Sequence, residues 1–392
     1  MRHDPLICCK DTIFFVNTKE IRRISLSLQQ NSMIMSKNIC IVAGARPNFV
    51  KVAPLVRAIR KSGLADYHLV YAGREDDPTL ESSLFDDLQM PRPDSYLGVD
   101  SVSLNEITSR VMGEFDRFLD THPADVVIVV DDLASTMAAA IVTKKRGIRL
   151  AHLVAGTRSF DINMPKEINR LVIDALSDYL FTAGVRSTGV ATREQAESSQ
   201  TYMVGNILMD TLRFNHDRLQ RPALMDSVSG PYIVLTLNRR ALLADEEKMR
   251  RMVEAMTDAA GDIPIIAPLR PDAAKVISHL SPLSTLHSPL SIVPPLSYLE
   301  FGWLTDHAAG VITDSGNVAE EATFNGVPCI TLNNYTEHQE TVSVGSNVLV
   351  GEDTDKLREA VGNMIRGEWK KCALPDRWDG RTAERIIQII TQ

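Results

Sequence analysis

The 392-residue sequence has few cysteines, few aromatic residues and no excess of positive charge. Its five cysteines are scattered, odd in number and without zinc-site spacing, so we expect neither a disulfide framework nor a metal site. A formal net charge of −8 argues against a general nucleic-acid-binding protein. No apolar run approaches the length of a membrane span. These absences favour a cytoplasmic globular protein without nucleic-acid or membrane partners.

The composition is that of an ordinary globular protein, with 44% hydrophobic and 23% charged residues. A chain of this length exceeds what one core usually supports, so two domains are expected. Residues 1–34 lack the compact apolar centre and the cleavage site of a secretion signal. Met35 opens a segment typical of the start of an α/β domain. We therefore predict that residues 1–34 are a disordered extension, or follow from a misplaced start codon.

Short apolar runs of strand length alternate with helical patterns along the rest of the chain. The runs that we predict as strands are 38–44, 67–73, 124–132 and 148–156, and then 232–238, 263–269, 284–290, 308–316 and 328–334. This alternation indicates parallel sheets covered by helices on both faces. We predict an α/β fold of two doubly wound, Rossmann-like domains, residues 35–205 and 206–375.

Polar clusters follow the ends of these predicted strands. They read GARPNFVK, VVDDLAST, HLVAGTRS, LNRR, APLRPD, TDSGNVAEE and LNNYTEHQE. In open parallel sheets, ligands bind beyond the carboxyl ends of the strands. The sequence therefore predicts a binding site in the cleft between the two domains.

The stretch ITDSGNVAEE predicts a strand that ends at Thr313 and a helix that begins near Val318. Free N–H groups at a helix start bind anions, and Gly316 allows a phosphate to approach closely. Glu320 and Glu321 then stand where they can accept hydrogen bonds from ribose hydroxyls. The alternative interpretation is a capped helix with acidic residues in its first turn.

Two further strand ends carry charged side chains. Arg46 and Lys51 lie at a predicted helix start, where two cations favour a phosphate group or an acidic partner. The alternative is a solvated helix start, but an arginine before a proline at the end of a buried strand favours ligand binding. Asp131 and Asp132 end a buried strand. One of them is expected to cap the next helix, and the other to face the cleft.

Seven separated blocks resemble, in order and spacing, the non-hydrolysing UDP-N-acetylglucosamine 2-epimerases. They are GARPNFVKVAPL, STMAAAI, GTRSFDINMPKEINRLVIDALSDYLF, VGN, PLSYLEFGWL, TDSGNVAEEATFNGVPCITL and TEHQETVSVGSNVLVG. The resemblance runs from about Lys37 to the C-terminus. It implies a GT-B arrangement with the nucleotide held mainly by the second domain, a C-terminal helix in 376–392 that packs back on the first domain, and a homodimer.

The resemblance also implies a reaction that interconverts UDP-GlcNAc and UDP-ManNAc for cell-surface polysaccharide synthesis. UDP leaves C1 by elimination to give 2-acetamidoglucal, and adds back after C2 is reprotonated on the other face. Such chemistry requires an acid and a base on opposite faces of the sugar and cations beside the diphosphate. It needs no cofactor.

Carried over residue by residue, the resemblance gives a set of UDP-sugar-binding candidates. They are Arg46, Lys51, Arg170, Asn238, Arg239, Arg270, Ser315, Gly316, Asn317 and Glu321. Several of them depart from the family pattern: Asn238 and Arg270 stand where histidines are usual, and Asn317 where a second glycine is usual. In addition, His338 stands at a usual arginine, and Asp131 replaces a glycine.

The acid/base positions depart further. Val154 and Lys166 occupy the places of two family carboxylates, which leaves Asp132, Lys166 and Glu167 as the catalytic candidates. Three hypotheses follow. The protein is an epimerase that uses these residues, or a non-catalytic UDP-sugar-binding subunit that partners an active homologue. The third is a GT-B glycosyltransferase, which only the fold supports.

Overall fold

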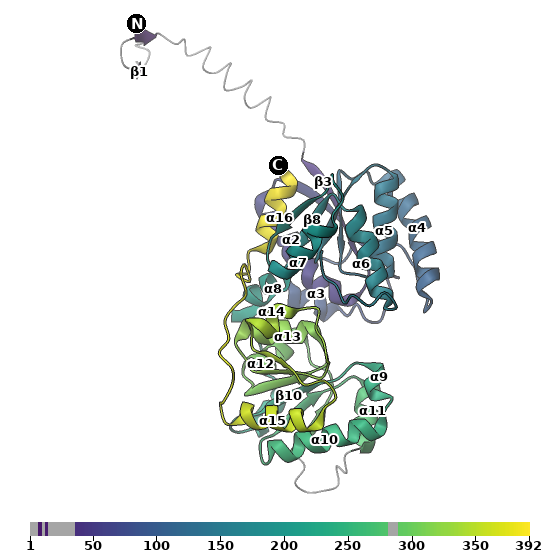
Figure 1. Cartoon of the computed structure of the whole chain (residues 1–392). Coiled ribbons are helices and arrows are strands. Elements are labelled where there is room, and N and C mark those ends of the chain that lie inside the picture. Colours follow the sequence, from purple (N-terminus) through teal and green to yellow (C-terminus); the bar gives the residue numbers. More distant parts are fainter. Residues whose placement is uncertain (1–6, 10–11, 15–35, 281–288) are drawn as a thin grey trace.

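The computed structural model describes residues 7–9, 12–14, 36–280 and 289–392 (Figure 1). Near the N-terminus, Ile7–Cys9 (β1) pairs antiparallel with Thr12–Phe14 (β2). Most of the predicted extension, residues 1–34, lies outside the described residues. No helix in the described part of the chain is long and apolar enough to cross a membrane.

The first half of the chain builds a parallel sheet of seven strands in the order β5-β4-β3-β6-β7-β8-β9. The strands are β3 (Lys37–Ala43), β4 (Ala65–Tyr71), β5 (Ser95–Tyr96), β6 (Val126–Val130), β7 (Arg149–Leu153), β8 (Tyr179–Thr182) and β9 (Gln200–Met203). The strand order reverses between β3 and β6, which makes this a doubly wound sheet.

The second half repeats the design with six parallel strands in the order β12-β11-β10-β13-β14-β15. They are β10 (Ile233–Thr236), β11 (Ile265–Pro268), β12 (Leu290–Val293), β13 (Gly310–Thr313), β14 (Cys329–Thr331) and β15 (Asn347–Leu349). Here the order reverses between β10 and β13. Two doubly wound parallel sheets confirm the predicted α/β class.

Helices connect the strands in both halves. In the first they are α2 (Arg46–Ser62), α3 (Ser82–Leu88), α4 (Leu104–Thr121), α5 (Ala134–Lys145), α6 (Pro165–Leu176) and α7 (Val185–Glu194). Helix α8 (Ile207–Asn215) and the 3₁₀ turns His216–Arg218 and Ala223–Ser227 lead to the second half. Its helices are α9 (Arg240–Leu243), α10 (Glu246–Ala260), α11 (Pro271–Leu280), α12 (Tyr298–Asp306), α13 (Gly316–Asn325), α14 (Gln339–Ser343) and α15 (Thr354–Ile365). The last helix of the chain is α16 (Thr382–Thr391).

Each sheet is buried on both faces because its strand residues alternate between two cores. Along β3, Ile39 and Ile41 join the core beneath α2 and α16, whereas Cys40 and Val42 join the core beneath α4 and α5. The second sheet divides in the same way between α10 with α15 and α12 with α13. Because both faces of each sheet are buried, the strands are apolar along nearly their whole length.

The last helix lies against the first half of the chain. In Figure 1, α16 lies beside α2, and both helices contact α8. Ile386, Ile387 and Ile390 enter the core under the first sheet. The carboxylate of Asp210 on α8 accepts the first backbone N–H groups of α16, from Thr382 and Ala383. The chain therefore crosses between the halves twice, between α8 and β10 and between α15 and α16.

The expectation that Asp131 or Asp132 caps the next helix is wrong, because the N-cap of α5 is Leu133 and both carboxylates bind other side chains. Some element bounds also differ from the sequence expectations. The predicted strand 284–290 overlaps the observed β12, Leu290–Val293, only at Leu290. Residues 284–288 of this prediction lie outside the described residues. The prediction that a helix begins near Val318 is wrong by two residues. Ser315 has the extended conformation of an N-cap, so α13 already begins at Gly316.

Candidate active site

A cavity of about 310 Å³ lies between the two halves, at the ends of β3, β6, β7 and β13. These ends include the point where the strand order of each sheet reverses, the place where doubly wound folds bind ligands. Side chains of both halves line the cavity. Among the predicted site residues they are Lys51, Asp132, Lys166, Arg170, Ser315, Gly316 and Asn317.

Lys51 is held at the cavity by an ion pair. Its Nζ lies 2.6 Å from Oδ1 of Asp131, and Oδ2 of the same carboxylate accepts a hydrogen bond from Asn48. The Asn48 side chain also accepts the N–H groups of Gly44 and Ala45, which fixes the turn before α2. Burial alone would lower the pKa of Lys51. The negative charges of Asp131, Glu320 and Asp132 outweigh this effect and raise the pKa above its ordinary value. The lysine is therefore cationic.

Asp132 faces the same cavity and contacts two cations. Its carboxylate lies 2.6 Å from the guanidinium of Arg170 and 3.3 Å from Nζ of Lys166. Burial would raise the pKa of Asp132, yet the two neighbouring cations lower it below its ordinary value. Asp132 is thus an ionised carboxylate beside an accessible ammonium group.

Glu167 does not line the cavity. Its buried carboxylate accepts hydrogen bonds from the backbone of Ser159 and Phe160, and from Arg170. These contacts fix the loop before α6 and leave the carboxylate turned away from the cavity. The structure therefore gives Glu167 the position of a loop-anchoring residue, behind Lys166.

A second buried network supports the loop after β7. His152 contacts Asp174 through Nδ1 at 2.5 Å, and its Nε2 lies 3.0 Å from the carbonyl oxygen of Asp131. Asp174 also binds Arg158 and the N–H of Gly156. Arg158, a cation of the predicted binding loop, is therefore an internal support. Val154 remains at the cavity with an unusual φ of 74°.

The second half of the chain contributes the start of α13. Ser315 is its N-cap residue and makes no side-chain capping hydrogen bond. The preceding Asp314 accepts the backbone N–H groups of Asn238 and Arg239. That contact joins the loops after β10 and β13 and holds the start of α13 at the cavity.

Several predicted binding residues do not reach the cavity. Asn238 and Arg270 are exposed, and Arg239 is paired with Glu352 and Asn333. Arg46 is the first residue of α2 and makes no ion pair or hydrogen bond through its side chain with the described residues. Glu321 lines a separate small pocket together with Tyr298.

In the second half of the chain, two residues outside the predicted set line the cavity. Glu337 joins the halves through a 2.8 Å contact with Arg170, and His338 lies beside the start of α13. Both belong to the polar segment after β14. Their position beyond the end of a strand was the feature of the sequence that could have indicated a role in the site. The sequence does not show which of its side chains point to the cavity.

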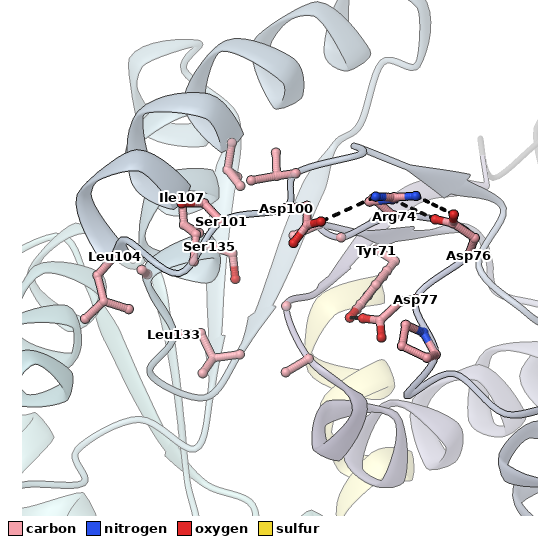
Figure 2. A pocket seen from close by; sticks show the side chains of 18 residues that line it. Tyr71, Arg74, Asp76, Asp77, Asp100, Ser101, Leu104, Ile107, Leu133 and Ser135 are labelled. Atoms are coloured by element: carbon pink, nitrogen blue, oxygen red, sulfur yellow. Dashed lines mark hydrogen bonds and ion pairs between the residues drawn. The ribbon is translucent and has the colours of Figure 1, made fainter.

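A second cavity of about 430 Å³ adjoins the first and shares Ala45 and Leu133 with it. Figure 2 shows its polar wall, where Arg74 bridges Asp76 and Asp100, and the hydroxyl of Tyr71 donates to Asp77 at 2.6 Å. Its carboxylates are thus paired within the wall.

Two doubly wound sheets that meet across a charged cleft define the GT-B class of α/β proteins. The sequence profile described as UDP-N-acetylglucosamine 2-epimerase matches residues 57–391. The chain is 34% identical to the UDP-N-acetylglucosamine 2-epimerase of Methanocaldococcus jannaschii, over 90% of this chain and 98% of that protein. It therefore belongs to the UDP-N-acetylglucosamine 2-epimerase family, as the sequence motifs predicted.

Other relatives show the breadth of the similarity. The UDP-2,3-diacetamido-2,3-dideoxy-D-glucuronate 2-epimerase of Pseudomonas aeruginosa is 32% identical over 90% of this chain and 99% of its own length. The M. jannaschii enzyme in complex with UDP-GlcNAc and UDP superposes with a TM-score of 0.79, over 90% of this chain and 99% of that one. The Neisseria meningitidis enzyme bound to UDP-GlcNAc, at 23% identity and a TM-score of 0.80, has the same fold over 90% of this chain and 99% of that one.

Proposed function

We propose that the protein binds a UDP-sugar in the cavity between its halves and interconverts UDP-GlcNAc and UDP-ManNAc. The observation that supports this most strongly is the cavity itself. Ionised Asp132, the ammonium of Lys166 and the free start of α13 line one space, in a chain of the epimerase family. The product suits cell-surface polysaccharide synthesis.

The proposed roles follow the position of each group. The diphosphate lies at the N–H groups of Gly316 and Asn317, where the helix start favours negative charge, with Lys51 nearby. Asp132 and Lys166 supply the acid and base at C2 of the sugar. Their 3.3 Å contact has to open in the complex, so that the sugar lies between the two groups. Arg170 fixes Asp132, and Glu167 fixes the loop over them.

Elimination then proceeds without a covalent intermediate. The base removes the C2 proton, its electron pair forms the C1–C2 double bond, and the C1–O bond breaks with its pair on UDP. Re-addition reverses these steps after protonation of C2 on the other face. The retained 2-acetamidoglucal must be shielded from water, and a cleft between two halves of the chain provides such shielding.

The remaining candidate binding residues keep supporting roles in this proposal. Arg46 and Arg270 lie near the ends of β3 and β11, and their side chains make no ion pair or hydrogen bond with the part of the chain that the structure describes. They approach the ligand if the halves close on it. Glu321 binds the ribose from its pocket behind the start of α13. Asn238 and Arg239 hold the edge of the cleft.

A second candidate function is a UDP-sugar-binding subunit without epimerase activity, which partners an active homologue. The observation that favours it is the pairing of Lys51 with Asp131, which neutralises a cation on the diphosphate side. The apolar Val154 at the cavity, where the family pattern has a carboxylate, also favours the subunit without epimerase activity. Glycosyl transfer to an acceptor is the remaining alternative.

Incubation with UDP-GlcNAc in D₂O, followed at C2 by NMR, separates these functions. Deuterium at C2 together with UDP-ManNAc supports the epimerase. Calorimetric binding of UDP without exchange supports the subunit, and release of free UDP only when an acceptor is present supports the transferase. Failure to bind UDP excludes all three.

A triple variant tests whether an intact scaffold has lost its chemistry. Val154→Glu, Lys166→Glu and Asn238→His together restore the family pattern. C2 exchange in this variant alone identifies the wild-type protein as the non-catalytic subunit. Exchange in the wild type that the triple variant does not increase shows that its own residues suffice.

Assembly and location complete the proposal. We propose a cytoplasmic homodimer, with domains 35–205 and 206–375 and the segment 376–392 that packs back on the first domain. Light scattering measures the assembly state of the purified chain. A monomer at micromolar concentration contradicts the dimer and leaves the other assignments unchanged.

A further inference from the structure

The second half of the chain brings two titratable side chains to the cavity, Glu337 and His338. Glu337 is bound to Arg170. His338 has its Nδ1 2.8 Å from Oε1 of Glu320, and its Nε2 has no hydrogen-bond partner among the described residues. His338 is therefore a titratable group that this half presents to the cavity with an unengaged ring nitrogen.

The imidazole of His338 lies against the first residue of α13. A Cβ placed on Gly316 would lie 2.8 Å from Cδ2 and 3.0 Å from Nε2 of the ring. Any side chain at Gly316 would have to displace the histidine. The unengaged Nε2 therefore lies at the start of α13, next to the N–H groups that face the proposed diphosphate.

Glu320 fixes the ring from behind. It is buried on α13, and the same Oε1 accepts a 2.7 Å hydrogen bond from Asn206. The side-chain oxygen of Asn206 in turn accepts the N–H of Leu208 at the start of α8. The orientation of His338 is thus set by a chain of contacts that runs to the junction of the two halves.

The charges around His338 favour its protonated form. Burial alone lowers the pKa of His338, but the charge and hydrogen bond of Glu320 outweigh this effect and raise the pKa above 6.5. Lys51 on α2 opposes the rise, and Glu337, next to it in the chain, adds to it. With Nδ1 donating to Glu320, the protonated ring presents a second N–H at Nε2.

We propose that His338 is a catalytic residue of the UDP-sugar reaction: its Nε2–H binds the β-phosphate of UDP, with Glu320 as its positioning residue. This inference rests on the proposed function. When the C1–O bond breaks, the electron pair goes to the departing UDP oxygen, and the imidazolium hydrogen-bonds to the phosphate that takes up this charge. On re-addition the same contact returns UDP to C1, so no proton is lost or gained at His338.

This role of His338 also accounts for the absence of the usual histidine at position 238, where this chain has Asn238. The side chain there is neutral and does not line the cavity, while its backbone N–H is bound to Asp314. A cationic donor for the leaving group must therefore come from another loop of the same half. His338 supplies it from the loop before α14.

The test compares His338→Gln with His279→Gln in the full chain. Glutamine at position 338 can still donate to Glu320 but carries no charge. His279 is an exposed residue on α11, far along the chain from the cavity residues, and serves as the matched control. Loss of the charged hydrogen bond should weaken UDP binding about tenfold or more in calorimetry, and the control should bind as the wild type does.

Catalysis and titration give the further readouts. His338→Gln should slow C2 exchange at saturating UDP-GlcNAc by about 10²-fold or more. The ¹⁵N signals of His338 should titrate above 6.5 in the wild type, fall in Glu320→Gln, and shift when UDP is added. The Glu320→Gln titration is a readout that a purely structural role would not move.

The outcomes separate this inference from the proposed function. Weaker UDP binding in His338→Gln, with no exchange even in the wild type, retains the diphosphate contact and overturns the epimerase. Weaker binding with an unchanged exchange rate at saturation overturns the catalytic role. Unchanged binding and unchanged exchange overturn the whole inference, as does a wild-type protein that binds no UDP.

Discussion

Asp131 forms a 2.6 Å ion pair with Lys51 and adopts a positive φ of 61° to do so. The family pattern has glycine at this position, and glycine adopts such a conformation without strain. In the proposed site, this carboxylate pairs with the cation that would otherwise face the diphosphate. A ligand phosphate would therefore compete with an internal carboxylate for Lys51.

Asp131→Gly should release Lys51 and tighten UDP binding by about tenfold, the scale of one charged hydrogen bond. The dependence of the affinity on salt should become steeper, since a free cation now meets the phosphate. Calorimetry at two salt concentrations measures both effects. Equal or weaker binding by the variant would show that Lys51 does not contact the ligand.

Lys166→Met tests the acid/base assignment. Its side chain is 57% exposed and its ammonium lies 3.3 Å from Asp132, so the substitution removes a proton donor with little structural cost. We expect C2 exchange to fall by about 10²–10⁴-fold at nearly unchanged UDP affinity. Lys275→Met, on the exposed face of α11, is the matched control. Exchange at the wild-type rate in both variants would remove Lys166 from the mechanism.

Much of this site could be predicted from the sequence. The runs that form β3, β6, β10 and β13 are apolar and end in polar turns, so the edge that carries the site followed from periodicity. Strands β5, β8, β9 and β15 were not predicted. β5, β9 and β15 are edge strands with at most one buried residue each, so they lack the buried apolar run that marks β6 or β13. They lie at or next to the sheet edges and do not shape the cavity.

The direction of individual side chains could not be predicted. Glu167 and Lys166 are adjacent on α6, yet one is buried in its loop and the other faces the cavity. Glu320 and Glu321 are likewise adjacent on α13, and they serve different pockets. Neighbours on a helix differ by about 100° in direction, so the tertiary packing decides which one meets the ligand.

Glu337→Gln tests the contact between the halves. The variant removes one charged partner of Arg170, whose side chain is only 3% exposed. We expect a loss of about 1–2 kcal/mol in unfolding free energy, because a buried guanidinium loses one charged partner. Glu384→Gln breaks the exposed pair with Lys61 and should change stability by no more than about 0.5 kcal/mol. Equal effects in denaturant titrations would contradict a buried contact.

Glu321→Gln tests a carboxyl group whose pKa is raised to about 8 by burial and by the nearby charge of Glu320. An ordinary glutamate titrates near 4.5, so between about pH 4.5 and 8 the folded chain holds a proton that the unfolded chain has lost. The stability of the wild type should therefore fall as pH rises through this window. The variant should lack this decline and be the more stable protein at pH 8, with the advantage vanishing toward pH 4.5. A difference that stays constant with pH would contradict the raised pKa.

Gly156→Ala tests the loop over the cavity. Gly156 has a φ of 73°, and a Cβ there would lie 2.1 Å from the backbone oxygen of Ser187, which cannot move without α7. Gly63 has a similar φ of 63° and nothing within 4 Å, so Gly63→Ala should cost only the conformational strain, roughly 1–2 kcal/mol. The same strain plus the clash should cost Gly156→Ala about 3 kcal/mol or more, and UDP binding should weaken with the displaced loop. Denaturant midpoints of the two variants check the difference. If both lose equal stability, the close approach to α7 does not hold the loop.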